Sequence, residues 1–525
     1  MRITLIGADF EENLALCMLS AAASRAGHTP QVIAFNEEDE IERIAERVVA
    51  AAPDVVGLSI QFQHRAHEFL RLAARLRTKG YRGHVTCGGQ FPTMAWQHVL
   101  STPTPLDTVV LHDGEETLVE LLRALEGSHP LAEVAGLALP GEAGPHKTRP
   151  RPFLATDLDA LAIAKRYRRH SKHGGVPFIP ILGGRGCWGS CSYCSITTFY
   201  RDGRASGGGG KTVRLRSPRS IAEEMAVLWH GADGAGVFCF HDDNFLLPRA
   251  SDTRERVQAI RSTLDELGVG RAAIVGKARP DCIDEALAKE LHRLGVIRLY
   301  VGVENASPAG ADHLGRRKQA QSIRQALAAC RSAGIFTCYN LLVFEPDTTL
   351  ADVRENVAFI REHASHPMNF CRAEPYHATP LHRQLERSGQ LRGSVLGWDY
   401  RIADDRAELL FRICASAFRN HNFAAQGVAN RYMGLGYVAK IIEHFHDDSV
   451  AVRSLVRRAA ELTRKISLDT ADHLERALHL AETVDLSDRE RIERQTAILG
   501  LEIAAADRVW HAHLDELFAE MDAFA

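Results

Sequence analysis

The chain has 525 residues, of which 45% are hydrophobic and 25% charged, and its formal net charge is -3. This length predicts roughly two to four domains, each with its own core. The near-neutral balance argues against nucleic acid or an anionic membrane as a partner, and no apolar run reaches the ~18 residues that a membrane-spanning helix needs.

Both the N-terminus and the cysteines favour a reducing compartment, and the cytoplasm is expected. The N-terminal stretch MRITLIGADFEEN has one arginine, a short apolar run and then acids. This pattern predicts a first strand and not a signal peptide. The chain has 11 cysteines, several of them in apolar, strand-like runs, and they fit a reducing compartment better than a disulfide framework.

Residues 1–140 alternate between strand and helix patterns. Apolar faces recur at helical spacing over 41–49 and 69–76. Repeated strand–helix–strand units predict a doubly wound parallel sheet whose ligands bind beyond the carboxyl ends of the strands. The expected strands are 3–7, 31–35, 55–60, 85–87 and 108–111.

Two segments that follow predicted strands share features with a known cofactor-binding domain. Residues 88–93 read Gly-Gly-Gln-Phe-Pro-Thr, and 113–117 read Asp-Gly-Glu-Glu-Thr. Two glycines let the backbone approach a large flat ligand, although such turns and helix-opening acids also occur without a ligand. Together the segments resemble the cobalamin-binding domains attached to radical S-adenosylmethionine (SAM) enzymes. The resemblance implies cobalamin contacts at Gly88, Gly89, Gln90, Pro92, Thr93, Gly114 and Glu115.

The lower face of the cobalamin is expected to lie against the loop after the third strand. Residues 1–140 contain no Asp-x-His-x-x-Gly, the pattern by which other cobalamin enzymes supply a histidine to cobalt. The resemblance therefore implies that Gln61 or Phe62 lies beneath the cobalt. His64 and His67 are alternative ligands, or surface histidines at the start of a helix.

Residues 141–175 are predicted to be a linker, because they carry proline, glycine and charge without a period. The basic residues 165–169 are interpreted as a solvated face, and 166–175 as an exposed lead-in to the next domain. The glycine run 206–210 before Lys211 is interpreted as a flexible loop. It does not form a phosphate-binding loop, because Ala205 stands where such a loop needs glycine.

From 176 to about 390 strands and helices alternate again, which predicts a partial barrel of roughly six βα units. The expected strands are 176–182, 237–241, 273–276, 299–303, 337–344 and 370–375, and the expected helices are 221–230, 253–267, 284–294, 320–333 and 351–363. Chemistry in such barrels lies at the carboxyl ends of the strands.

A cysteine motif follows the first of these strands. Cys187, Cys191 and Cys194 have the spacing Cys-x-x-x-Cys-x-x-Cys in the sequence GGRGCWGSCSYC. Soft thiolates suit iron–sulfur clusters, and three ligands on a four-iron cube leave one iron open to substrate. The alternative is buried or zinc-bound cysteines, but structural zinc usually takes four ligands.

With Tyr193 just before the last cysteine, this motif resembles the signature of the radical SAM superfamily. The resemblance implies a 4Fe–4S cluster whose open iron chelates the amino and carboxylate groups of SAM, with Tyr193 near the adenine.

Polar residues that end the later strands are the candidate SAM contacts. Asp242, Asp243 and Asn244 end the second strand and resemble the stretch that receives the SAM amino group, although Asp and Asn also favour capping turns. Arg279 ends the third strand and can pair with the SAM carboxylate as a bidentate fork. Glu304 resembles the position that contacts the ribose.

The sixth strand and the C-terminal region are the expected substrate side. Tyr376 and His377 either face the substrate or pack in an ordinary way. The C-terminal region is predicted to be a helical cap over the barrel mouth, because no strand period appears after about 395. Its helices are expected at 407–418, 435–444, 450–465, 471–484 and 489–521.

Over residues 1–390 the chain thus resembles the cobalamin-dependent radical SAM enzymes. The implied α/β architecture has a cobalamin-binding domain at 1–140, a linker at 141–175, a radical SAM barrel at 176–390 and a helical substrate-capping domain at 391–525. The resemblance implies a methyltransferase that uses a deoxyadenosyl radical and methylcobalamin to methylate an unactivated carbon of a small molecule or peptide. It also implies an external reductant such as flavodoxin or ferredoxin.

Two alternatives to the methyltransferase are open. The first is a cyclase, oxidase or ring-rearranging enzyme of the same architecture. The second is a cobalamin- or redox-responsive binding protein with a degenerate barrel. A methylthiolating enzyme is disfavoured because that family carries a different N-terminal domain with its own cysteines.

Overall fold

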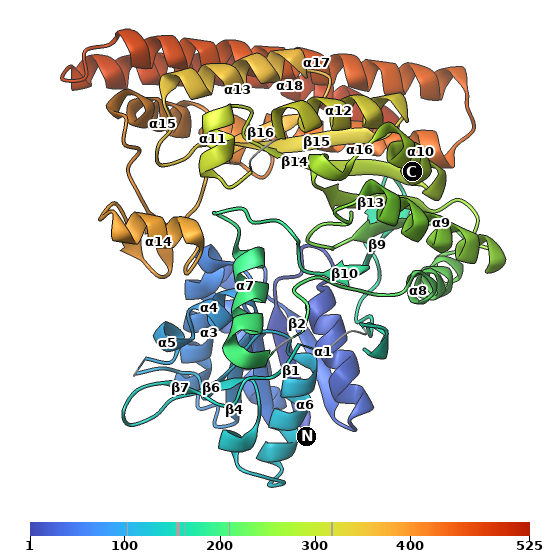
Figure 1. Cartoon of the computed structure of the whole chain (residues 1–525), viewed down its shortest axis with the longest axis vertical. Coiled ribbons are helices and arrows are strands. Elements are labelled where there is room, and N and C mark those ends of the chain that lie inside the picture. Colours follow the sequence, from blue (N-terminus) through green and yellow to red (C-terminus); the bar gives the residue numbers. More distant parts are fainter. Residues whose placement is uncertain (102, 154–157, 162, 209, 317–318, 525) are drawn as a thin grey trace. The chain divides into compact units, whose positions relative to one another are not determined.

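The structure is a computed structural model that describes residues 1–101, 103–153, 158–161, 163–208, 210–316 and 319–524 (Figure 1). They form two compact units. The first unit consists of Met1–His170, Pro180–Ser220 and Glu374–Asp399, and the second of Ser171–Ile179, Ile221–Ala373 and Tyr400–Ala525. This grouping follows contacts within the fold, and the predicted domain boundaries stay predictions.

The first unit is built on a sheet with the strand order β2-β1-β3-β4-β5-β6-β7. The strands are β1 (Arg2–Gly7), β2 (Thr29–Ala34), β3 (Val55–Ser59), β4 (His84–Gly88), β5 (Thr108–Val110), β6 (Leu137–Leu139) and β7 (His146–Lys147). Strands β1 to β5 pair in parallel, and β6 and β7 add antiparallel edge strands. The order 2-1-3-4-5 reverses between β1 and β3, which is where doubly wound sheets bind ligands.

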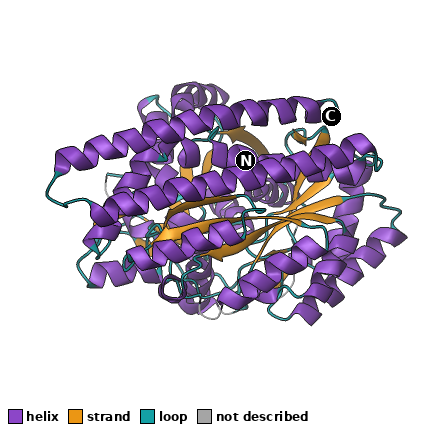
Figure 2. Cartoon of the chain, turned by 90° about the horizontal axis from the view of Figure 1, so that it is seen from above, coloured by secondary structure: helices purple, strands orange, loops and turns teal. Residues whose placement is uncertain are grey.

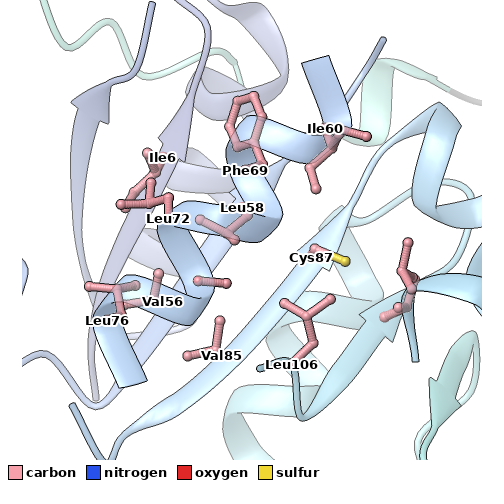
Figure 3. Close-up of a cluster of buried hydrophobic side chains, with 14 of the residues drawn as sticks. Ile6, Val56, Leu58, Ile60, Phe69, Leu72, Leu76, Val85, Cys87 and Leu106 are labelled. Atoms are coloured by element: carbon pink, nitrogen blue, oxygen red, sulfur yellow. The ribbon is translucent and has the colours of Figure 1, made fainter. Parts of the chain in front are cut away.

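Helices between the strands cover this sheet. They are α1 (Leu14–Arg25), η1 (Glu38–Glu40), α2 (Ile41–Ala51), η2 (Gln63–Arg65), α3 (Ala66–Thr78), α4 (Gln90–Met94), α5 (Trp96–Val99), α6 (Glu115–Leu125), η3 (Leu131–Glu133) and η4 (Leu158–Ala160). Phe69, Leu72 and Leu76 recur on one face of α3 and are buried against Val56 and Leu58 of β3 (Figure 3). Each such side chain stabilises the fold by about 1.5–3 kcal/mol.

A short hairpin that the sequence pattern does not predict joins this core. Strands β17 (Arg392–Ser394) and β18 (Gly397–Asp399) pair antiparallel after helix α14 (Pro380–Arg387). The connecting Val395 is buried in the same hydrophobic core as β3 and α3. Strands of three residues are too short to show a period of two, so the expectation of no strand after about 395 is wrong here.

The basic segment before the second unit is also different from its prediction as a solvated face. Arg166 donates to Glu12 at 3.0 Å, and Arg168 lies 3.4 Å from Asp9. Glu12 and Asp9 are 1% and 6% exposed at the side chain. These buried acids follow β1 and are far from the arginines in sequence, so the ion pairs could not be inferred from the segment alone.

The second unit contains a sheet with the order β16-β15-β14-β13-β12-β9-β8. Its strands are β8 (Lys172–His173), β9 (Val176–Ile181), β12 (Val237–Phe240), β13 (Ala273–Ala278), β14 (Val296–Glu304), β15 (Phe336–Phe344) and β16 (Met368–Arg372). Strands β12 to β16 pair in parallel, and β8 forms an antiparallel edge. The order has two ends, so the sheet is a partial barrel.

Helices alternate with these strands along the chain and continue after the last one. Figure 2 draws the helices in purple and the strands in orange. They are α8 (Pro218–His230), α9 (Ala250–Glu266), η6 (Pro280–Cys282), α10 (Glu285–Leu294), α11 (Pro308–His313), α12 (Gln319–Ser332), α13 (Leu350–Glu362), α15 (Asp405–Ala417), η7 (Arg419–Phe423), α16 (Val428–Phe445), α17 (Val450–Thr483) and α18 (Arg489–Asp522). The predicted fold class, a parallel sheet, a partial barrel and a helical C-terminal region, is confirmed.

Helix α17 merges the two helices predicted at 450–465 and 471–484. Ile466, Ser467 and Thr470 continue its buried face, and the Thr470 hydroxyl donates to the Ile466 carbonyl at 2.9 Å within the helix. A polar residue whose hydroxyl bonds to the carbonyl four residues earlier does not end a helix. Although α17 and α18 have 34 residues each, no helix among the described residues is apolar enough over a sufficient length to cross a membrane.

The C-terminal helices contact both ends of the barrel strands. On α16, Tyr437 and Ile441 pack against Val176, Val237 and Ala273, the first residues of their strands. This is the end opposite to the one at which such barrels carry their chemistry. The prediction of a cap over the mouth therefore does not hold for α16.

The segment that begins at Tyr400 lies at the other end of the strands. Arg372, the last residue of β16, donates to the Tyr400 carbonyl at 3.0 Å, and its guanidinium lies 4.3 Å from the centre of the Phe411 ring. Phe344, the last residue of β15, packs against Phe411 with ring centres 5.5 Å apart. The segment from Tyr400 into the middle of α15 thus reaches the carboxyl ends of these strands.

Acid is expected to destabilise the second unit through His366. Its side chain is buried, and burial lowers its pKa from 6.5 to about 4, with His363 and Arg331 adding to the effect. Between these values the unfolded chain binds a proton that the folded chain does not. Stability present above pH 6.5 is therefore lost as the pH falls toward 4, by about 3 kcal/mol.

The matched variant is His366→Asn, whose amide can still bond the Thr337 hydroxyl that contacts His366 at 2.7 Å. Denaturant unfolding at pH 7 and pH 4.5 measures the difference between the two proteins. A wild type and a variant that lose equal stability on acidification would contradict this role of His366.

Candidate functional site

The cysteine loop begins at a two-stranded hairpin in the first unit. Strands β10 (Gly184–Arg185) and β11 (Arg214–Leu215) pair antiparallel, and helix α7 (Ser195–Gly203) starts directly after Cys194, while η5 (Arg204–Gly208) follows α7. Gly186 has a φ of +88°, and a Cβ at this position would lie 1.9 Å from the Thr212 carbonyl oxygen. Only glycine allows the chain to turn from the hairpin into the loop.

The three thiols of the loop suit a cluster better than a single ion. Burial, with a smaller contribution from the neighbouring Cys191 and Cys187 thiols, raises the pKa of the Cys194 thiol to about 12. Three soft thiolates fit an iron–sulfur cube, whereas structural zinc usually takes four protein ligands.

The loop is held by hydrogen bonds from within the same unit. The Leu381 amide of α14 donates to the Ser192 carbonyl at 2.9 Å, and the Ser195 hydroxyl donates to the Gln90 side-chain oxygen at 3.2 Å. Gln90 belongs to the predicted cobalamin motif. One end of the cysteine motif therefore touches a residue that was predicted to bind the other cofactor.

The reversal point of the first sheet carries two exposed aromatic rings. Phe10 and Phe62 stand three residues beyond the ends of the adjacent strands β1 and β3 and are 65% and 43% exposed. Phe62 also stacks on His64 with ring centres 5.5 Å apart, and Gln61 is exposed beside it. Exposed apolar surface at this position suits a large flat ligand. The residues present therefore fit a corrin ring.

The two glycines at the end of β4, Gly88 and Gly89, also fit a site for a large flat ligand. A Cβ on Gly89, which has a φ of +113°, would lie 2.5 Å from the Ile60 carbonyl oxygen, and one on Gly88 would lie 3.3 Å from the Val110 carbonyl oxygen. Both residues allow neighbouring strand ends to approach closely. Pro92 and Thr93 follow in α4 and are buried, and the Thr93 hydroxyl accepts from the His112 amide at 3.1 Å.

The second predicted cobalamin segment makes ion pairs with the hairpin of the cysteine loop. Glu115 pairs with Arg185, and Asp113 pairs with Arg185 at 3.2 Å and with Arg214. Burial raises the pKa of Asp113, but the charges of Arg185 and Arg214 outweigh it, so this pKa lies below its ordinary value. Gly114 between the acids packs against Leu19, which a Cβ would approach to 3.1 Å.

In the second unit the predicted SAM contacts occupy the carboxyl ends of neighbouring strands. Asp242 is buried after β12, and Asp243 and Asn244 are half-buried. The Asn244 amide nitrogen donates to the Leu246 carbonyl at 2.5 Å, and its oxygen accepts from the Arg279 amide at 3.1 Å. The Arg279 guanidinium donates to Asp281 at 2.8 Å. Asn244 thus holds two strand ends together.

Glu304 ends β14 in an uncommon backbone conformation. Its φ is +64°, and the pairing of β14 with β15 shifts register between Val301 and Glu304. Its carboxylate lies 3.7 Å from the buried guanidinium of Arg316. Positive φ in a non-glycine residue is strained and is frequent at functional sites.

Tyr376 and His377 belong to the first unit and not to the barrel strands. The His377 amide donates to the Gln63 side-chain oxygen at 2.7 Å, and its ring lies 4.9 Å from the His382 ring and 6.2 Å from the Trp398 ring. Burial lowers the pKa of His377 to about 4, so the ring is neutral.

The structure thus gathers the three cysteines, Tyr193, the cobalamin candidates, Tyr376 and His377 in the first unit. The candidates Asp242 to Asn244, Arg279 and Glu304 share the carboxyl edge of the second unit. The sequence reasoning missed Phe10, which an aromatic residue just beyond a strand end could have signalled. It also missed Arg185 and Arg214, whose partners are distant in sequence.

Replacing Asn244 by Asp is expected to destabilise the second unit. The new carboxylate would face the Leu246 carbonyl, where Asn244 now donates a hydrogen bond. A carbonyl that loses its hydrogen-bond donor in this way destabilises the fold by about 1–3 kcal/mol. Asn430→Asp is the control, because the Asn430 amide donates to the Ala424 carbonyl at 2.9 Å in an exposed position that water can satisfy. Denaturant unfolding compares the two, and equal losses would contradict the assignment.

Two protein families match different parts of the chain. Residues 7–122 match the B12 binding domain, and residues 181–360 match the radical SAM superfamily. The first match contains the predicted cobalamin motifs, and the second begins just before the cysteine loop. The first family implies cobalamin, and the second implies SAM and a 4Fe–4S cluster.

Curated relatives with similar sequences have different names. An anaerobic magnesium-protoporphyrin IX monomethyl ester cyclase from Synechocystis is 27% identical over 56% of this chain and 56% of its own length. An uncharacterized methyltransferase from Pyrococcus horikoshii is 25% identical over 73% of this chain and 77% of its own. A hopanoid C-3 methylase from Methylococcus capsulatus is 26% identical over 64% and 61%. The match thus spans little more than half of the cyclase.

Solved structures share the fold. The cobalamin-dependent SAM radical enzyme OxsB aligns with a TM-score of 0.66 at 14% identity over 100% of this chain and 84% of its own. The radical SAM methyltransferase TsrM from Kitasatospora setae aligns with a TM-score of 0.60 at 19% identity over 75% and 76%. The chain therefore belongs to the B12 binding domain family over residues 7–122 and to the radical SAM superfamily over residues 181–360, and it shares its fold with cobalamin-dependent radical SAM enzymes.

Proposed function

We propose that the protein is a C-methyltransferase that methylates an unactivated carbon of a small molecule or peptide. The observation that carries this proposal is the contact between the two cofactor motifs. Ser195, next to Cys194, donates to Gln90, and Arg185, just before Cys187, pairs with Glu115. A cluster loop seated on the cobalamin motifs lets one substrate carbon meet both cofactors. Relatives named as a methyltransferase and a methylase support the same reading.

When bound, the cluster and SAM supply a deoxyadenosyl radical that abstracts hydrogen, and cobalamin supplies the methyl group. The protein supplies orientation and exclusion of water. Cys187, Cys191 and Cys194 are proposed to hold the cluster. Tyr193, Asp242, Asp243, Asn244, Arg279 and Glu304 are proposed SAM contacts.

The proposed corrin contacts come from three strand ends of the first sheet. Phe62 and Gln61 after β3 would lie against its lower face, and Phe10 after β1 extends this apolar surface. The remaining proposed contacts are Gly88, Gly89, Gln90, Pro92, Thr93, Gly114 and Glu115. Tyr376 and His377 are proposed to face the substrate, because their segment contacts both Gln63 and the cysteine loop.

A non-methylating enzyme of the same architecture is the second candidate. The similarity to a relative named as a cyclase favours it. An external reductant such as flavodoxin or ferredoxin is proposed for either activity. The 11 cysteines, all within the described part of the chain, form no disulfide with one another, which fits a reducing compartment such as the cytoplasm.

The test uses protein reconstituted anaerobically with iron, sulfide and hydroxocobalamin. It is incubated with a reductant, candidate substrates and SAM that carries a deuterated methyl group. The methyltransferase is expected to form deoxyadenosine and S-adenosylhomocysteine together with a product that gains one labelled methyl group. Substrate-dependent deoxyadenosine without S-adenosylhomocysteine would instead support the cyclase, oxidase or rearranging enzyme. Bound cofactors without either product would support a binding protein.

A further inference from the structure

Four charged side chains form a buried group at the base of the cysteine loop. This arginine–carboxylate cluster consists of Asp113, Glu115, Arg185 and Arg214. Arg185 Nη1 lies 3.2 Å from Asp113 Oδ1 and 3.3 Å from Glu115 Oε2, and Arg214 Nη1 lies 2.5 Å from Asp113 Oδ2. The exposed side-chain fractions are 14%, 9%, 12% and 0% in the order given.

The cluster is balanced in charge, with two guanidinium groups against two carboxylates. The Arg214 guanidinium also lies 4.5 Å from the centre of the Phe153 ring. Burying charges is unfavourable unless each has its partner, so the cluster is stable as a complete set and removal of one member leaves a buried charge without its counterion.

The geometry ties the cysteine loop to the cobalamin-binding region. Arg185 and Arg214 are directly paired residues of the β10–β11 hairpin, and Asp113 and Glu115 flank the start of α6. Arg185 stands two residues before Cys187, a span of at most about 7 Å. Gly186, which lies between them, allows no side chain because of the Thr212 carbonyl. A shift of the Arg185 side chain would therefore be transmitted directly to the first cluster ligand.

We propose that Arg185 is a positioning residue that couples the two cofactor sites by fixing the cysteine loop to Asp113 and Glu115. This inference rests on the proposed function, since it requires both cofactors in one protein. Because the same carboxylates stand in the predicted cobalamin motif, cluster assembly orders them for cobalamin. By reciprocity, cobalamin favours the loop conformation that holds the cluster.

The charges of the arginine–carboxylate cluster give the proposal a second consequence. The one-electron reduction of the cluster from the 2+ to the 1+ state adds negative charge near Arg185. Glu115→Gln removes a nearby negative charge and is expected to raise the midpoint potential. Arg185→Gln removes a positive charge and is expected to lower it. A residue that only supported the fold would not move the potential in opposite directions in the two variants.

The first experiment measures hydroxocobalamin binding by absorbance to the full chain, with and without the reconstituted cluster. In the wild type the cluster is expected to tighten binding by about fivefold or more, the lower range of typical coupling between sites. The coupling ratio is the cobalamin dissociation constant without the cluster divided by the constant with it. In Arg185→Gln this ratio is expected to fall to about one. Arg185→Lys, which keeps the charge but not the two-pronged contact, should restore the potential but only part of the ratio.

Glu12→Gln is the matched control. Glu12 pairs with Arg166 in the same unit, and the two are 1% and 14% exposed, similar to Glu115 and Arg185. This pair does not belong to the arginine–carboxylate cluster, so the variant should keep the wild-type ratio and potential. Thermal unfolding of each protein shows whether a variant has lost its fold. If Arg185→Gln does not fold, Arg185→Lys is the milder variant that still tests the coupling.

The possible outcomes separate the inference from the proposed function. A wild type that binds iron and cobalamin with a ratio near one overturns the coupling alone. Shifts of potential in the same direction in Arg185→Gln and Glu115→Gln overturn the electrostatic part. A wild type that retains no iron or no cobalt after reconstitution overturns the proposed function and this inference together.

Discussion

Cys191→Ala is expected to abolish iron loading and to reduce SAM cleavage by more than about 100-fold. Loss of a residue that only supports a metal ligand costs up to about 100-fold, so loss of a ligand itself should cost more. Cys191 is 5% exposed and its thiol lies between the other two in the sequence of the loop. A cube held by three thiolates cannot keep its geometry on two. Iron and sulfide content and deoxyadenosine formation after reconstitution are the measurements.

The control for this prediction is Cys87→Ala. Cys87 is a buried cysteine of β4 in the same unit, and it packs in the hydrophobic core shown in Figure 3. Its loss removes a small apolar side chain and should leave iron loading unchanged. Cobalamin should remain bound in both variants, although more weakly in Cys191→Ala if the two sites are coupled. Full iron content in Cys191→Ala would show that the cluster is held elsewhere.

Gly186→Ala is expected to prevent the loop from forming, with a loss of stability above about 4 kcal/mol, the exceptional range for a point mutation. The new methyl group would lie 1.9 Å from the Thr212 carbonyl oxygen, so the hairpin of β10 and β11 would have to open. Iron should be lost with it, because the loop leaves this hairpin two residues before Cys187. Thermal unfolding and iron content measure the two effects.

Gly27→Ala separates the steric clash from backbone strain. Gly27 has a φ of +87°, nearly that of Gly186, but nothing lies within 4 Å of the position of its Cβ. This control should lose only the cost of the left-handed conformation, about 1–2 kcal/mol, and should load iron normally. Equal losses in the two variants would mean that strain and not the clash determines the effect at Gly186.

Local patterns in the sequence are sufficient to predict most of the fold, and the proposed cluster ligands come from such a pattern as well. Buried strands such as β3 and amphipathic helices such as α3 show their burial in the spacing of apolar residues, because each element repeats with its own period. The cysteine loop is similarly local, since the three proposed ligands of one cluster stand within eight residues of one another. The merging of two predicted helices into α17 is an exception, because the hydroxyl of Thr470 donates a hydrogen bond to the Ile466 carbonyl within the same helix.

Only the tertiary structure decided how the polar residues are shared among partners. Glu115 lies in a segment that predicts a cobalamin contact, yet its carboxylate binds Arg185, which is 70 residues away in sequence, and Asp113 binds Arg214, 101 residues away. The buried pair of Arg166 with Glu12 has the same origin. Ion pairs have no period and no fixed spacing, since any two charges that the fold brings together can form one. The sequence by itself therefore determined the elements and the cluster motif, whereas the folded chain decided which charges meet and so how the cysteine loop is held.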